Sequence, residues 1–590
     1  MAATPQDVQA TFCTTLTDEW VRAGLVHAVV CPGSRSTPLA LALVASELAV
    51  HVVLDERSAG FVAIGLARAS GRATVVCVTS GTAAAELHAA VVEADLDGVP
   101  LIVCTADRPA ELLQVGAPQT IVQRGLYGDA LRFFAEPGVP DAAAALTWRS
   151  LGARLVLEAE SGPLGCGPVH INCGFREPLV GATLSLPEGR LRGASWHAAA
   201  PAAIGAACDD GFVDRIIGRR GVLVAGAGCG DPAKILELSA RLGWPVFADV
   251  RSGCRATDTD AVVVAHADAL LRVGELVDRL VPDVVIHTGA PWASKVVGAW
   301  AATVGDSILL DPVGSWRDPH RRAAVVAPFG VGEVIAGLDR CAATEFARPD
   351  GWASHWAAAE SAAGAAIAVR FAQQVGLDDP CVANTVLGCG GTGIQIMVSS
   401  SMPIRDAEWY GGLHHPARVV HANRGANGID GVSSTAMGLA LAGNPTLLLT
   451  GDLAFLHDAS ALLSASAVSA PTVIVVVDNN GGGIFEFLPQ ASILDRNTFE
   501  VMFGTPQTAR VGDVAAGFGL PVEHVNRRLD LCAAIQRGLR SPGVRVVVVQ
   551  TDRRASPAAH DELHLLVTHA VRGSMQLWTG TTELRPSPQP

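Results

Sequence analysis

The chain has 590 residues, of which 49% are hydrophobic and 17% are charged, and its formal net charge is −14. This length exceeds what one hydrophobic core usually organises, so we expect two to four globular domains rather than a disordered or fibrous protein. The acidic balance, with no cluster of basic residues, argues against nucleic acid as a partner.

The start of the chain, residues 1–12, has no basic region followed by an apolar segment, so it does not predict a signal peptide. Farther along, acidic residues interrupt the apolar stretches before they reach the roughly 18 residues that a membrane helix needs. The 13 cysteines are scattered without the spacing of a zinc site. We therefore expect a cytoplasmic protein with no membrane insertion, whose cysteines are small core residues.

The first region alternates apolar runs with helical patterns. Continuous apolar strands separated by helices indicate a parallel sheet that helices cover on both faces. We predict one doubly wound α/β domain over residues 1–190. Its apolar runs are residues 27–31, 50–54, 73–78 and 101–105, and the turns after them contain Ser34 and Arg35, Glu56, Ser80, and Arg108.

A passage rich in proline, alanine and glycine, residues 186–207, predicts a linker. Buried strands at residues 221–226, 245–248 and 284–288 predict a smaller α/β domain over residues 205–342. The turn Gly226-Ala227-Gly228-Cys229-Gly230-Asp231 is similar to a dinucleotide-binding loop, but aspartate stands where the last glycine of G-x-G-x-x-G would fall. We expect no flavin there. Residues 346–354 predict a second connection.

The last region again alternates apolar runs with helical patterns, and we predict a third domain over residues 355–572. In an open parallel sheet, ligands bind in the crevice beyond the carboxyl ends of the strands. Residues 573–590 are polar and proline-rich and predict a loosely held tail. The apolar runs of this third domain, residues 418–422, 446–450 and 472–477, end in Asn423-Arg424-Gly425, Gly451-Asp452 and Asp478-Asn479-Asn480.

Asp452 and Asn479 end two successive predicted β-α units, and Gly481 follows in the next turn. A carboxylate, an amide and a turn carbonyl supply oxygen ligands, which suit a Mg²⁺ ion that also holds phosphates. Taken singly, each feature is also typical of a helix cap or a tight turn. Taken together, they resemble the diphosphate-binding signature of thiamine-diphosphate enzymes. The resemblance implies thiamine diphosphate and Mg²⁺ as cofactors, with Gly451 and Asp452 at the diphosphate and with Asp452, Asn479 and Gly481 as metal ligands.

The same enzymes use a glutamate from a separate pyrimidine-binding domain, which hydrogen-bonds the aminopyrimidine ring of the cofactor. Glu56, in Leu54-Asp55-Glu56-Arg57, occupies the matching place. A glutamate in the first turn of a helix is favoured by the helix dipole whatever its function. Because the signatures of two domains agree, we predict Glu56 as the catalytic residue and as a cofactor ligand.

A closer match covers nearly the whole chain. It consists of the motifs Cys31-Pro32-Gly33-Ser34-Arg35-Ser36, Thr79-Ser80-Gly81-Thr82, Ala106-Asp107-Arg108-Pro109, Ser401-Met402-Pro403-Ile404-Arg405-Asp406, Asn423-Arg424-Gly425, Gly428-Ile429-Asp430-Gly431 and Gly481-Gly482-Gly483-Ile484-Phe485. Together these motifs resemble the family of 2-succinyl-5-enolpyruvyl-6-hydroxy-3-cyclohexene-1-carboxylate synthases. The set is specific, because other thiamine-diphosphate enzymes share the metal signature without this string of arginine motifs. The resemblance implies a pyrimidine-binding, a middle and a diphosphate-binding domain.

The resemblance also implies which residues bind the substrates. The substrates of this family, 2-oxoglutarate and isochorismate, each carry two carboxylates, which the guanidinium fork of arginine is suited to bind. For any single arginine, a surface or interdomain ion pair is an equal alternative. By similarity, Ser34, Arg35, Arg108, Gln119 and Lys295 would hold isochorismate, Ser401, Arg405 and Arg424 would face the part derived from 2-oxoglutarate, Ile429 would bend the cofactor, and Ile484, Phe485 and Leu488 would line the site.

The implied activity is a transferase reaction of menaquinone biosynthesis, in which 2-oxoglutarate is decarboxylated and its succinyl unit is added in a 1,4 sense to isochorismate. The resemblance implies a homodimer or homotetramer with sites shared between chains. Two alternatives stay open, another thiamine-diphosphate-dependent 2-oxoacid decarboxylase or acetolactate-type carboligase, and a catalytically silent binding subunit. Pro118, Ser400 and Gly483 depart from the family pattern, and they bear on the substrate contacts rather than on the metal signature.

Overall fold

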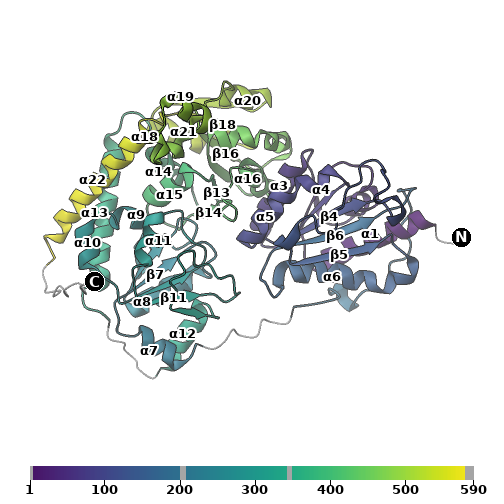
Figure 1. The fold of residues 1–590 in the computed structure, drawn as a ribbon, viewed down its shortest axis with the longest axis horizontal. Coiled ribbons are helices and arrows are strands. Elements are labelled where there is room, and N and C mark those ends of the chain that lie inside the picture. The colour runs from purple at the N-terminus through teal and green to yellow at the C-terminus, as the bar shows by residue number, and fades with distance from the viewer. Residues whose placement is uncertain (1–3, 200–207, 342–347, 579–590) are drawn as a thin grey trace.

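The computed structural model describes residues 4–199, 208–341 and 348–578, which form three parallel sheets of six strands each (Figure 1). Helices cover both faces of these sheets, so the predicted α/β class with three doubly wound sheets is confirmed. The domain limits at residues 190, 205, 342, 355 and 572 stay a prediction. Within the described ranges, no helix is long and apolar enough to cross a membrane.

The first sheet has the strand order β2-β1-β3-β4-β6-β5. All four predicted strands are present, and the fourth extends two residues farther, to Asp107. The sequence did not single out β6, because His170 and Asn172 interrupt its apolar run. The strands are β1 (His27–Val30), β2 (Ala49–Val52), β3 (Thr74–Val78), β4 (Leu101–Asp107), β5 (Phe133–Gly138) and β6 (Pro168–Gly174), and the main helices are α1 (Pro5–Arg22), α2 (Thr37–Val44), α3 (Glu56–Ser70), α4 (Thr82–Glu86), α5 (His88–Asp97) and α6 (Ala145–Ser161).

The middle sheet has the order β12-β11-β10-β7-β8-β9, in which the chain direction across the sheet reverses between β7 and β10. The glycine-rich turn after β7 packs against a neighbouring loop, since a Cβ added at Gly226 would lie 1.8 Å from the Ala290 carbonyl oxygen. The elements are β7 (Gly221–Ala225), β8 (Pro245–Ala248), β9 (Val262–Val264), β10 (Val284–Thr288), β11 (Ser307–Leu310), β12 (Val325–Ala327), α7 (Asp210–Ile216), α8 (Pro232–Leu242), α9 (Ala267–Leu270), α10 (Gly274–Arg279), α11 (Lys295–Ala301) and α12 (Val331–Arg340).

The third sheet has the order β14-β13-β15-β16-β18-β17, which repeats the topology of the first sheet strand for strand. All three predicted strands are present in it. The strands are β13 (Gln395–Val398), β14 (Val419–His421), β15 (Thr446–Gly451), β16 (Thr472–Asp478), β17 (Val522–Val525) and β18 (Val544–Gln550), and the helical segments are α13 (Trp352–Gln373), α14 (Asp379–Cys389), α15 (Met402–Tyr410), α16 (Val432–Leu441), α17 (Asp452–His457), η5 (Ala459–Ala467), η6 (Gly483–Phe487), α18 (Gln490–Ile493), α19 (Arg496–Phe499), η7 (Glu500–Gly504), α20 (Val511–Gly517), α21 (Arg528–Gly538) and α22 (Ser556–Met575).

Helices α13 and α22 lie side by side and belong to the hydrophobic core of the middle sheet (Figure 1). Helix α13 begins at Trp352, so the predicted connection over residues 346–354 is wrong at its end. Helix α22 continues to Met575, and the Trp578 ring stacks on His355 at 4.3 Å. The predicted loose tail is therefore wrong for residues 573–578, and its remainder lies outside the described residues.

The first and third sheets are joined through the crossing of α3 and α16 (Figure 1). At this crossing the two helix backbones touch, because a Cβ added at Gly65 would lie 2.1 Å from the Thr435 carbonyl oxygen and one at Gly438 would lie 2.2 Å from the Val62 carbonyl oxygen. Only glycine permits such a close approach. The crossing fixes where the start of α3, and with it Glu56, stands relative to the third sheet.

Candidate functional site

The predicted polar clusters of the third sheet meet at the carboxyl ends of its strands, around a cavity of about 500 Å³. The cavity lies where β13 and β15 are neighbours, which is the point where the strand order reverses. Open α/β sheets bind ligands at such points. Its lining includes Asp379, Ser401, Arg405, Asp406, Arg424, Ile429, Gly451, Asp452, Asn479, Gly481, Gly483, Ile484 and Phe485.

Asp452 follows β15 and is the first residue of α17. Its carboxylate accepts hydrogen bonds from the backbone amides of Leu453 and Gly481, each at 2.7 Å. The residue is only 5% exposed, so Asp452 is buried although it stands at the end of a strand. Burial raises the pKa of Asp452 to about 6. A buried carboxylate with no cationic side chain bonded to it is a suitable ligand for a bound cation.

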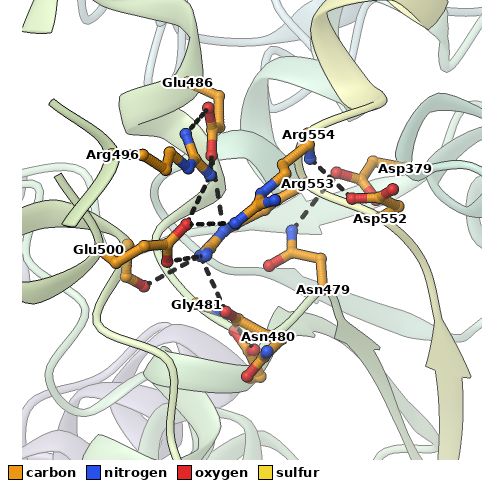
Figure 2. Close-up of polar contacts among 12 residues, drawn as sticks. Asp379, Asn479, Asn480, Gly481, Glu486, Arg496, Glu500, Asp552, Arg553 and Arg554 are labelled. Atoms are coloured by element: carbon orange, nitrogen blue, oxygen red, sulfur yellow. Dashed lines mark hydrogen bonds and ion pairs between the residues drawn. The ribbon is translucent and has the colours of Figure 1, made fainter. Parts of the chain in front are cut away.

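Asn479 follows β16 and has an unusual hydrogen-bond pattern. Its Nδ2 donates to Asp379 at 3.5 Å (Figure 2), while its Oδ1 is buried and has no hydrogen-bond partner in the part of the chain that the structure describes. Asp379 is itself held by the hydroxyls of Thr551 at 2.6 Å and Ser556 at 3.1 Å. The amide is therefore oriented with a free oxygen. Buried polar atoms normally have partners, so this oxygen indicates a missing ligand.

Asp452, Asn479 and Gly481 all line this cavity, and a carboxylate, an amide oxygen and a backbone carbonyl are ligand types that fit a hard cation such as Mg²⁺. Among the described residues there is no group of three or more His, Cys, Asp and Glu placed to hold a metal. The predicted ligand set does not require such a group, because two of its three members are a side-chain amide and a backbone carbonyl. The residues present thus fit the cofactor metal.

Two arginines give the cavity positive charge. Arg405 Nη1 donates to the Ser401 carbonyl at 2.5 Å, and the buried Nε of Arg424 has no partner among the described residues. Burial, with Arg251 and Arg405 nearby, lowers the pKa of Arg424 to about 10. Close guanidinium groups with free donors favour binding of carboxylates.

The apolar part of the lining includes Ile429, Ile484 and Phe485. Leu488, which we expected in the lining, lies beyond it, at the end of η6. Gly483, one of the departures from the family pattern, lies against a predicted metal ligand, because a Cβ added there would be 2.8 Å from Asn479 Nδ2. A side chain at this position would require the Asn479 amide to shift.

The predicted isochorismate residues of the first sheet form a separate group at the ends of β1, β3 and β4. Arg108 Nη1 donates to the Gln119 carbonyl at 2.9 Å and also bonds the Ser80 hydroxyl. Arg35 pairs with Glu177 at 2.9 Å, and the turn that precedes it exposes Ser34. Burial, with Arg35 nearby, lowers the pKa of Arg108. Arg35 and Arg108 are thus near each other, with Gln119 bonded to Arg108 and with Ser34 in the turn before Arg35.

Glu56 is the first residue of α3 and is half-buried. The cap of this helix is the preceding Asp55, whose carboxylate accepts from the Ser58 amide at 3.0 Å. The Glu56 carboxylate lies close enough to Cys31 to add to the effect of burial, which raises the pKa of that thiol. Glu56 is therefore not needed as the cap and stands beside the turn that holds Ser34.

Lys295 is exposed at the start of α11 and lines a different cavity, of about 240 Å³, in the middle sheet. In one chain, the 500 Å³ cavity is lined only by residues from Asp379 onward, so neither Glu56 nor the arginines of the first sheet reach it. Arg57, the residue after Glu56, donates from Nη2 to the His457 carbonyl at 3.0 Å, which places the start of α3 beside the end of α17. The predicted site residues are thus divided into three groups.

Sequence reasoning missed two residues that support the predicted metal ligands. Asp379 has no motif around it, and it lies 100 positions from the asparagine that it orients. Arg553 follows β18 and donates to the Asn480 carbonyl at 2.9 Å. The apolar run of β18 is visible in the sequence, so the strand-end argument applied there would have pointed to Arg553.

Comparison with known proteins agrees with this geometry. Residues 11–126 match the family model "Thiamine pyrophosphate enzyme, N-terminal TPP binding domain", and residues 410–549 match "Thiamine pyrophosphate enzyme, C-terminal TPP binding domain". Thiamine pyrophosphate is another name for thiamine diphosphate.

Three relatives carry the name 2-succinyl-5-enolpyruvyl-6-hydroxy-3-cyclohexene-1-carboxylate synthase. The protein of Thermobifida fusca is 42% identical over 94% of this chain and 98% of its own length. That of Myxococcus xanthus is 39% identical over 93% of this chain and 95% of its own length. That of Bacillus velezensis is 37% identical over 95% of this chain and 97% of its own length.

Proposed function

This chain belongs to the family of 2-succinyl-5-enolpyruvyl-6-hydroxy-3-cyclohexene-1-carboxylate synthases, which are thiamine-diphosphate-dependent transferases, and on that premise we propose its reaction and site. It decarboxylates 2-oxoglutarate and adds the remaining succinyl unit in a 1,4 sense to isochorismate, a step of menaquinone biosynthesis. The observation that carries the proposal is the 500 Å³ cavity, whose lining combines Arg405 and Arg424 with the oxygen-bearing residues Asp452 and Asn479.

The cofactor is held by residues of the third sheet. Asp452, Asn479 and the Gly481 carbonyl would hold Mg²⁺, whose positive charge would help to bind the diphosphate, and Gly451 would contribute to the same part of the site. Ile429, Ile484 and Phe485 form the apolar wall and exclude water from the reacting end of the site. When bound, the thiazolium ring supplies the electron sink that loss of carbon dioxide from a 2-oxo acid requires.

The substrates are recognised by two sets of cations. Arg405 and Arg424, with Ser401, bind the carboxylates of 2-oxoglutarate, because all three residues line the cavity and a guanidinium group is suited to bind a carboxylate. On the first sheet, Ser34, Arg35, Arg108 and Gln119 bind isochorismate. Lys295 has less support for this role, since it lines the cavity of the middle sheet.

The site is completed by a second chain. Glu56 and the arginines of the first sheet stand outside the lining of the 500 Å³ cavity in one chain, so a complete set needs these residues from a neighbour. A symmetric dimer, alone or within a tetramer, is the simplest closed arrangement that shares two such sites. Glu56 of each chain then serves the cavity of the other.

Mixing two inactive variants tests this arrangement. Glu56→Gln and Asp452→Ala are each expected to be inactive alone, but after subunit exchange every heterodimer has one site with both defects and one with neither. Random exchange should then restore roughly a quarter of wild-type activity. If native mass spectrometry shows exchange while activity stays at background, the site lies within one chain.

The reaction itself is tested by identifying the product. We expect purified protein with thiamine diphosphate, Mg²⁺, 2-oxoglutarate and isochorismate to give a product whose mass equals the sum of the two substrates minus carbon dioxide. A parallel incubation with pyruvate as the only oxo acid tests the alternative of an acetolactate-type carboligase. Acetolactate from pyruvate, with no product from isochorismate, would favour that alternative.

A further inference from the structure

Arg553 is a buried arginine at the centre of a group of charged residues next to the predicted metal ligands (Figure 2). It follows β18, and its side chain is 6% exposed. One nitrogen, Nη2, pairs with Glu500, and Nε lies 3.6 Å from Glu486 Oε1. Both glutamates belong to the segment that follows the metal-ligand turn, in η6 and η7. Arg553 thus connects the end of β18 to that segment.

The remaining nitrogen of Arg553, Nη1, donates to two backbone carbonyls. It lies 2.9 Å from the oxygen of Asn480 and 3.3 Å from that of Gly504. The Asn480 carbonyl belongs to the same peptide unit as the Gly481 amide, which donates to Asp452 at 2.7 Å. This single peptide unit is therefore held on one side by Arg553 and on the other by a predicted metal ligand.

The backbone around this peptide unit is tightly enclosed. Gly481 has a φ of +130°, and a Cβ added to it would lie 1.9 Å from the Gly504 carbonyl oxygen and 2.8 Å from Arg553 Nη1. The next amide, that of Gly482, donates to the same Gly504 carbonyl at 2.8 Å. A rotation of the 480–481 peptide plane would break bonds on both of its sides and would displace the two ligands that flank Asn480.

Charge neutralisation alone does not explain Arg553. Arg496 already pairs with Glu486 at 2.7 Å and with Glu500 at 2.7 Å, and the exposed Arg554 pairs with Glu500 at 2.8 Å. The two glutamates therefore have cationic partners without Arg553. What distinguishes it from these neighbours is its pair of bonds to backbone carbonyls, one of which belongs to the turn between Asn479 and Gly481.

We propose that Arg553 is a positioning residue for the metal site, which fixes the peptide plane between Asn479 and Gly481 so that both ligands meet the ion held by Asp452. The inference rests on the proposed Mg²⁺ site. Side chains that orient metal ligands without touching the metal typically change its affinity by about 10- to 100-fold. Arg553 is unlike Asp379, which orients the Asn479 side chain rather than the backbone of the turn.

The test compares Arg553→Ala with Arg554→Ala in the full-length protein. Mg²⁺ is titrated into metal-free protein at saturating thiamine diphosphate, and its dissociation constant is measured by calorimetry. We expect Arg553→Ala to raise this constant about 10- to 100-fold. Arg554→Ala removes an exposed partner of the same glutamate and no carbonyl contact, so its effect should stay below about fivefold.

Thermal unfolding of the cofactor-free variants separates positioning from stability. The inference predicts that Arg553→Ala unfolds cooperatively without cofactor and that methylguanidinium restores part of its Mg²⁺ affinity. If Arg553→Ala does not fold, Arg553→Lys replaces it, because a single ammonium cannot pair with Glu500 and donate to both carbonyls at once. Weak Mg²⁺ binding by a folded Arg553→Lys supports the inference in that case.

Three results overturn the inference. The first is wild-type Mg²⁺ affinity in a folded Arg553 variant. The second is a loss of Mg²⁺ affinity in Arg554→Ala that equals the loss in Arg553→Ala. The third is that both Arg553 variants lose their cofactor-free fold together with metal binding, since Arg553 is then structural. A wild-type protein that binds thiamine diphosphate without any requirement for Mg²⁺ would instead refute the metal site itself.

Discussion

Asp452→Ala is expected to abolish Mg²⁺-dependent binding of thiamine diphosphate, measured by calorimetry on the purified protein. The change removes the only carboxylate among the three predicted ligands. It also leaves the amides of Leu453 and Gly481 without their acceptor, at a cost of about 1–3 kcal/mol for each buried donor. The variant should therefore unfold at a lower temperature than the wild type while remaining folded at 25 °C.

A buried aspartate six positions away provides the matched control. Asp458 is fully buried and accepts from the amide and the hydroxyl of Ser434, at 2.7 and 2.8 Å, but it does not line the cavity. Asp458→Asn should lower stability and keep cofactor binding, whereas Asp452→Asn should lose binding. If Asp452→Ala binds thiamine diphosphate with wild-type dependence on Mg²⁺, the metal assignment is wrong.

Glu56→Gln is expected to reduce decarboxylation of 2-oxoglutarate by at least about two orders of magnitude, the scale typical of general acid–base groups. Glutamine keeps the size of the side chain but cannot take or hold a proton at Oε. Calorimetry should show that the cofactor still binds, because the metal ligands are unchanged. The measurement is the initial rate of carbon dioxide release without isochorismate.

The neighbouring carboxylate separates this role from a role at the helix start. Asp55 caps α3, and asparagine is an equally good cap, so Asp55→Asn should keep both stability and most of the activity. If the rate of decarboxylation falls only a few-fold in Glu56→Gln, Glu56 serves α3 through the helix dipole alone.

The predictable part of the fold follows from runs of apolar residues. Strands such as Pro245–Ala248 and Val284–Thr288 lie where the sequence indicates them, because both faces of a parallel sheet are covered and all their residues except His287 are buried. Strand β6 was missed for the opposite reason, since the buried His170 and Asn172 both hydrogen-bond the Thr105 hydroxyl of β4, a contact that the sequence does not reveal.

The predictable part of the site follows from strand ends. Asp452, Asn479 and Arg424 were placed at one edge of a sheet because parallel strands share their carboxyl ends, and the structure brings all three to one cavity. The burial of Asp452 was not predictable, because it results from the Gly481 turn that folds over it. Lys295 came from the resemblance alone, and the structure places it at another cavity.

The sequence by itself therefore determined the parallel strands, the side chains that follow them and the family, because these depend on short runs of neighbouring residues. Only the tertiary structure decided which of these groups meet. Asp379 reaches Asn479 across 100 positions, and Arg553 reaches Asn480 across 73, through packing that no local pattern records. The separation of Glu56 from the cavity is likewise a result of how α3 crosses α16, and it is the reason that the proposed site needs a second chain.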